Sequence, residues 1–146
     1  MTERGWQRAR LDEIPPSGLA ADRAYWRQWA RDPSYPRVWR SIRHYFGLTG
    51  FGVNAVEANA GEELVVPHDE LDFGGQEELY LVLRGRALFV CDGEEVEVRE
   101  GELLSVRPHV KREARALETP TILFMVGGVP GGAYQPWPGD SLGVSS

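Results

Sequence analysis

The chain has 146 residues and a formal net charge of −6, with 42% hydrophobic and 26% charged residues. These values are typical of one globular domain that can bury a core, and the single cysteine, Cys91, excludes an intrachain disulfide. Residues 57–102 contain fourteen acidic residues and three arginines, which disfavours nucleic acid as a partner. The first ten residues lack an apolar stretch and no run of about eighteen apolar residues follows, so we expect a cytoplasmic protein without a membrane-spanning helix.

The N-terminal third is predicted to form short helices. One helix is expected from Leu19 to Ala30, and a second from Tyr35 to Phe46, where Gly47 ends it as a C-cap. Nine arginines face five acids in residues 1–45, and we expect this basic segment to pack on the acidic region of its own chain or of a sister subunit. Three tryptophans of this segment are expected to pack in the core rather than to stack on a ligand: Trp26, Trp29 and Trp39.

The central part of the chain is predicted to form about eight short strands. They are Phe51–Ala58, Glu63–Val66, Leu79–Arg84, Ala87–Cys91, Glu94–Val98, Leu103–Val106, Lys111–Ala116 and Thr121–Val126. Asp92-Gly93 is a two-residue hairpin signal, and Glu100-Gly101 is a second turn. Short strands with turns between them favour an all-β sandwich or barrel and exclude a parallel α/β sheet. We therefore expect a helical extension over residues 1–48, a barrel over 49–126 and a Gly/Pro-rich tail over 127–146.

Residues 61–85, GEELVVPHDELDFGGQEELYLVLRG, concentrate the groups that can bind a ligand or a metal. His68 and Glu70 are two residues apart, so on a strand both side chains point to the same side. Glu78 stands at the start of the next predicted strand. One imidazole and two carboxylates can therefore converge inside the barrel as a metal-binding set.

This stretch resembles the first motif of the cupin superfamily, and the resemblance covers roughly residues 49–126. That motif has a Gly, a His-any-His pair, a Glu, and a Gly seven residues after the Glu; the matching residues are Gly61, His68, Glu78 and Gly85. The segment from Gly101, GELLSVRPHVKREARA, resembles the second motif, which normally ends in a His. The resemblance implies an antiparallel double-stranded β-barrel, or jelly roll, with one or two short N-terminal helices before it.

The sequence departs from the cupin metal motif at two positions. Glu70 stands where the first motif has the second His of its pair. The position of the His that ends the second motif falls at Arg112 when the residues are counted without a gap, or at Lys111 with one gap. His109 lies near the position that usually holds a Gly. Arginine stays protonated and cannot bind a metal. We expect Arg112 to occupy the place of the metal and to pair with Glu70 and Glu78. The alternative is that these residues and His68 face outward as ordinary strand charges.

Three functions remain open at this point. The first is a metal-free or weakly metal-binding module, binding or regulatory, that holds a small molecule in a pocket formed by His68, Glu70, Glu78 and Arg112. The second is a metal-dependent enzyme of dioxygenase or isomerase type, in which His68, Glu70 and Glu78 bind iron, manganese, zinc or nickel. The third is a structural or interaction protein. His68 is the candidate catalytic residue, either at a metal or alone as a general base. A homodimer formed through an edge strand is expected, with neither nucleic acid nor membrane as a partner.

Overall fold

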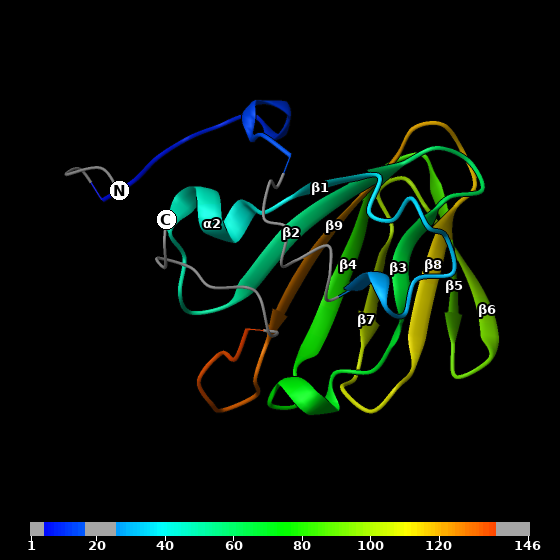
Figure 1. Ribbon diagram of the computed structural model, residues 1–146. Helices are drawn as coiled ribbons and strands as arrows, with labels where there is room; N and C mark the ends of the chain where they lie inside the picture. Colours follow the sequence, from blue (N-terminus) through cyan, green and yellow to red (C-terminus); the bar gives the residue numbers. More distant parts are fainter. Residues whose placement is uncertain (1–4, 17–25, 137–146) are drawn as a thin grey trace.

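The alternation of apolar and polar residues along the strands builds two antiparallel sheets that face each other (Figure 1). The computed structural model describes residues 5–16 and 26–136. The strands are β1 (Val38–Arg40), β2 (Gly52–Ala58), β3 (Glu63–His68), β4 (Glu77–Arg84), β5 (Arg86–Cys91), β6 (Glu94–Arg99), β7 (Leu103–Val106), β8 (Arg112–Ala116) and β9 (Thr121–Gly128). Helix α2 spans Ile42–Phe46, and two short 3₁₀ turns span Leu11–Glu13 and Leu71–Phe73.

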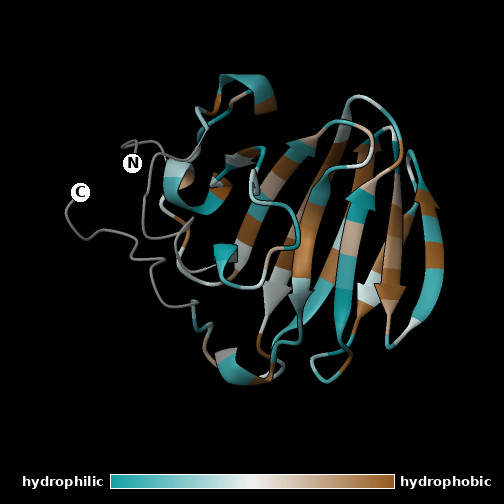
Figure 2. Cartoon of the chain, turned by 45° about the vertical axis from the view of Figure 1, so that its right-hand side comes forward, coloured by the Kyte–Doolittle hydropathy of each residue, from teal (hydrophilic) through white to brown (hydrophobic). Residues whose placement is uncertain are grey.

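The larger sheet has the order β1-β2-β9-β4-β7, and the smaller sheet has the order β3-β8-β5-β6. Successive side chains of a strand point to opposite faces, so every second residue of β9 is buried. Figure 2 shows hydrophobic and hydrophilic bands along the strands of both sheets. The inward-facing residues form one core between the sheets, which includes Val56, Leu64, Val82, Phe89 and Leu123. The prediction of an all-β jelly roll is confirmed.

The turns form where the sequence predicted them. Asp92 and Gly93 both have positive φ, at 49° and 85°, which is the backbone of the type I′ hairpin between β5 and β6. Gly85, between β4 and β5, has a φ of +81°, and a Cβ atom there would lie 2.6 Å from the carbonyl oxygen of Pro120. Only glycine fits both the backbone conformation and the space at this position.

The predicted helix over Tyr35–Phe46 is wrong in its first half. Val38–Arg40 form β1, which pairs with β2 at the edge of the larger sheet, and the helix begins only at Ile42. The apolar residues whose spacing indicated one helix pack in two different places. Trp39 packs on the core between the sheets, whereas Ile42 packs on the outer face of β2. Gly47 ends the helix in the left-handed conformation, as predicted. The first predicted helix lies mostly outside the described residues, of which Trp26 and Arg27 are helical.

A second apolar cluster covers the outer face of the larger sheet near β2. Ile14 and Ile42 pack there against Val53 and Ala55, and α2 lies beside β2 in Figure 1.

Cys91 is partly buried at the end of β5, and burial raises the pKa of its thiol, which disfavours the reactive thiolate. In the described part of the chain, no helix is long and apolar enough to cross a membrane.

Candidate functional site

A narrow cavity of about 50 Å³ opens between the two sheets. Its apolar wall includes Trp26, Trp39 and Met125, and its polar wall includes His68 and Glu70. Strand β3 and the loop after it supply the polar groups, while the tryptophans come from the segment that precedes β2. An apolar cavity with a few converging polar groups is the usual form of a small-molecule site.

His68 ends β3 and forms a closed pair with Glu70. Its Nδ1 lies 2.7 Å from the carbonyl oxygen of Val66, and its Nε2 lies 2.7 Å from Oε2 of Glu70. A carbonyl oxygen only accepts, so Nδ1 carries a hydrogen and donates it. A single proton then lies between Nε2 and the Glu70 carboxyl group, whichever of the two residues formally holds it.

The electrostatics of this pair follow from its burial. Glu70 is only 5% exposed, and burial together with the charge of Glu78 raises the pKa of Glu70 to about 7. Burial lowers the pKa of His68, but the hydrogen bond to Glu70 and the charges of Glu70 and Glu78 outweigh that effect and leave it raised. The two groups therefore titrate together as one hydrogen-bonded pair and not independently.

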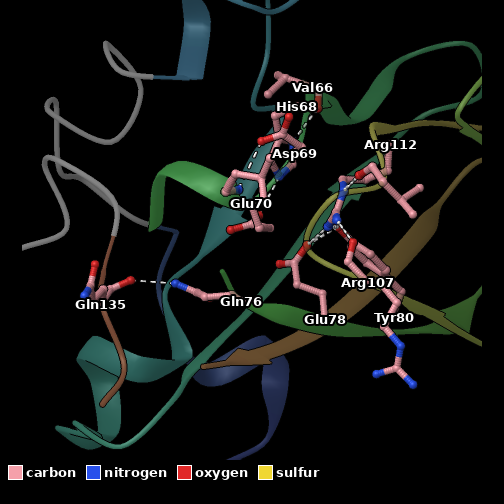
Figure 3. Close-up of polar contacts among 12 residues, drawn as sticks. Val66, His68, Asp69, Glu70, Gln76, Glu78, Tyr80, Arg107, Arg112 and Gln135 are labelled. Atoms are coloured by element: carbon pink, nitrogen blue, oxygen red, sulfur yellow. Dashed lines mark hydrogen bonds and ion pairs between the residues drawn. The ribbon is translucent and has the colours of Figure 1, made fainter. Parts of the chain in front are cut away.

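Arg112, on β8, is completely buried, and its guanidinium points to Glu78 and Tyr80 (Figure 3). Nη1 lies 2.5 Å from Oε1 of Glu78, and the Tyr80 hydroxyl donates to the same oxygen at 2.5 Å. The other nitrogen atoms donate to backbone carbonyl groups: Nε to Val110 at 3.0 Å and Nη2 to Arg107 at 2.8 Å. The positive charge is thus fixed by a charge-assisted bond and two carbonyl groups.

Comparison with known proteins finds the same architecture in solved structures, although no family model and no curated protein matches the sequence. A cupin protein from Bacteroides fragilis is 26% identical over 71% of this chain and 86% of that one, with a TM-score of 0.55. A sugar phosphate isomerase of the cupin superfamily from Silicibacter pomeroyi is 19% identical over 84% of this chain and 75% of that one, with a TM-score of 0.62. The chain thus has the fold of cupin proteins.

The match to a protein of Acidithiobacillus ferrooxidans is shorter, with 17% identity, a TM-score of 0.55 and coverage of 62% of this chain and 57% of that protein. The alignment therefore spans little more than half the length of that relative. At such identities the likeness shows the fold, and the chemistry has to be argued from the site.

The metal-binding potential of the chain rests on His68, Glu70 and Glu78. One donor atom from each residue lies within 4.8 Å of the others, so the group can hold a metal ion. All three side chains are engaged, however: Nε2 of His68 and Oε2 of Glu70 with each other, and Oε1 of Glu78 with the Arg112 guanidinium. A divalent ion needs donors at about 2.0–2.2 Å, and at that distance from Glu78 it would be repelled by the adjacent guanidinium.

Of the two residues that could stand at the second-motif histidine, the structure places Arg112 inside the barrel. It lies opposite His68 in the register of β3 and β8, whereas Lys111 is exposed. His109 is also exposed, in the loop before β8. Arg112 binds Glu78 through one short bond, and Glu70 pairs with His68 instead. The four expected pocket residues thus form two adjacent ion pairs and do not face outward.

Several cavity residues were not singled out from the sequence as ligand-binding groups. Trp26 and Tyr35 pack with Val66, as expected for core aromatics, but they also line the cavity, and the Trp26 ring contacts the His68 ring with centroids 5.0 Å apart. Asn54 also lines the cavity and is 5% exposed. A signal for Asn54 was present, since it is the single amide on the inward side of the apolar strand β2.

Proposed function

We propose that this chain binds a small molecule in the cavity and that Arg112 supplies there the positive charge that a metal would otherwise supply. The observation that carries the proposal is the contact of the fully buried guanidinium with Glu78, at 2.5 Å. The charge is permanent, because arginine does not lose its proton in proteins. Glu78 is thereby neutralised without an exogenous ion.

The walls of the cavity suit a ligand with an apolar body and a polar end. Trp26, Tyr35 and Trp39 provide aromatic surface, which favours burial of rings and aliphatic carbon. The His68–Glu70 pair provides a polar group that can give or take a proton, and thus match either a donor or an acceptor on the ligand. Such a site supports binding or regulation without any chemical step.

Metal analysis tests the first half of the proposal. Tag-free protein is dialysed without chelator, exposed in turn to Fe²⁺, Mn²⁺, Zn²⁺ and Ni²⁺, and dialysed again before elemental analysis. We expect well below one metal ion per chain for the wild type. In the variant Arg112→His, an imidazole replaces the cation at the motif position, and we expect metal retention to rise toward one ion per chain. One ion per wild-type chain, lost in His68→Ala, would contradict the proposal.

A thermal-shift screen of metabolites tests the second half. A ligand at one hundred times its dissociation constant stabilises the folded state by about 2.7 kcal/mol, which corresponds to a rise in Tm of roughly 5–10 °C for a chain of this size. We expect the shift to be lost in His68→Ala. The control is His109→Ala, because His109 is an exposed histidine outside the cavity. A ligand that shifts all three proteins equally binds elsewhere.

A metal-dependent enzyme, of isomerase or dioxygenase type, is the second candidate. It is favoured by the donor atoms of His68, Glu70 and Glu78, which lie within 4.8 Å of one another, and by the likeness of the fold to the sugar phosphate isomerase from Silicibacter pomeroyi. A bound metal would supply Lewis-acid or redox chemistry, and His68, Glu70 and Glu78 would be the residues that hold it. Activity that chelation abolishes and a single metal restores would select this candidate over the first.

A further inference from the structure

We infer that the ligand of the cavity is a small organic cation, an ammonium or amidinium group on an apolar body. The inference rests on the proposed function and adds the chemical class of the ligand. It joins three observations: the charge of the cavity lining, an unsatisfied acceptor on β2, and an aromatic wall.

The charge of the lining excludes anions. Of the described residues that line the cavity, the acidic ones are Glu70 and Glu78, and neither lysine nor arginine is among them. Arg112 lies behind Glu78 and directs its donors to Glu78 and to backbone carbonyl groups. A phosphate or carboxylate would therefore meet two carboxylates, and the two side chains that can carry a positive charge, His68 and Arg112, already pair with them. This lining is unsuited to a sugar phosphate.

Asn54 shows which hydrogen-bonding group the cavity lacks. Its side chain lines the cavity at 5% exposure, and its Oδ1 atom is buried without a hydrogen-bond partner among the described residues. A buried acceptor left in this state destabilises the empty cavity, and a bound donor would remove that penalty. An ammonium or amidinium group supplies N–H donors and no acceptor, so it suits Asn54 and the carboxylates together.

The aromatic wall favours a cation over a neutral donor of the same shape. Trp26, Tyr35 and Trp39 line the cavity on which Glu70 and Glu78 also border. The faces of such rings attract a positive charge, and the attraction grows when water is excluded. Arg112 pairs with Glu78 and His68 pairs with Glu70, so a cationic ligand would contact the two carboxylates as hydrogen-bond acceptors.

Three probes with one apolar body test the class: benzylammonium, benzyl alcohol and benzyl phosphate. Their affinities for the full chain are measured at pH 7.5 by calorimetry and by ligand-observed NMR, up to about 10 mM. We expect benzylammonium to bind at least ten-fold more tightly than benzyl alcohol, and benzyl phosphate not to bind. Asn54→Leu is expected to weaken benzylammonium at least five-fold, and Asn54→Asp, which keeps the acceptor, to retain it. Asn59→Leu changes the other asparagine, which lies outside the cavity, and is the control.

The outcomes separate this inference from the proposed function. Equal or tighter binding of the alcohol or the phosphate ester in the cavity overturns the cationic class but leaves a small-molecule site. Failure of all three probes to bind overturns the cationic class as well, and the metabolite screen then decides the proposed function by itself. Loss of benzylammonium binding in Asn54→Asp as in Asn54→Leu would show that Asn54 acts through packing and not as an acceptor.

Discussion

Replacing Arg112 by methionine is expected to destabilise the fold by about 3–5 kcal/mol, because it leaves a buried carboxylate without its counter-charge. The Glu78 side chain is only 12% exposed, so water cannot replace the guanidinium that lies 2.5 Å away. Methionine fills much of the same volume, so the loss of stability does not arise from an empty cavity. The carbonyl groups of Arg107 and Val110 lose their donors as well.

The neutral partner variant separates charge from packing. Glu78→Gln alone leaves Arg112 buried and unpaired, so it should also be strongly destabilising. In the double variant Arg112→Met with Glu78→Gln both charges are gone, and we expect a loss smaller than the sum of the two single losses by about 2–3 kcal/mol. Arg107→Met is the matched control: that arginine side chain is 69% exposed in its ion pair with Glu77, so its removal should cost less than about 1 kcal/mol.

Urea unfolding at pH 7, followed by tryptophan fluorescence, measures these differences. With a slope of about 2 kcal/mol per molar urea, the loss predicted for Arg112→Met moves the midpoint down by about 1.5–2.5 M. The reasoning is refuted if Arg112→Met unfolds within about 1 kcal/mol of the wild type. It is also refuted if the double variant loses the full sum, since the two charges would then be independent.

Two further predictions concern positions away from the cavity. Gly85→Ala should destabilise the fold by more than about 2 kcal/mol in urea unfolding, since it combines a positive φ with a Cβ 2.6 Å from a carbonyl oxygen. Gly93 also has a positive φ, but a Cβ atom there would contact nothing, so Gly93→Ala should destabilise the fold by only about 1 kcal/mol. Equal losses of stability in the two variants would contradict the steric argument. Burial raises the pKa of the Glu63 carboxyl group above its usual value of 4.5. The contribution of Glu63 to the stability of the fold is therefore present below that pH and is lost as the pH rises through the raised pKa. The stability of Glu63→Gln relative to the wild type should therefore increase as the pH rises above about 4.5. A relative stability that decreases over this range would show that the pKa of Glu63 is lowered in the fold and not raised.

The strands were predictable from the sequence because their signals are local. Alternation of apolar residues and glycine at the turns place the strands from β2 to β9 within about two residues of their observed ends. The edge strand β1 was not predictable, because Val38 and Trp39 also fit a helical spacing. What decides between the two is pairing with β2, and the sequence does not show it.

The site was predictable only as a set of residue types. Spacing within one strand indicated that His68 and Glu70 share a side, and the resemblance to cupins placed Glu78 and a cation near them. Two facts depend on the tertiary structure: that Arg112 rather than Lys111 points inward, and that the two ion pairs are separate. The register of β8 against β3 sets the first, and the direct bond from His68 to Glu70 sets the second.

The two departures from the cupin metal motif make physical sense as a pair. Glu70 in place of a histidine adds a buried negative charge, and Arg112 in place of another histidine adds a buried positive charge. Without a metal, either change alone would alter the charge of a poorly hydrated site. Together they leave Glu78 neutralised by Arg112 and leave Glu70 to share a proton with His68. A cavity balanced in this way no longer needs a divalent ion, and Glu70 is the carboxylate that a cationic ligand can engage.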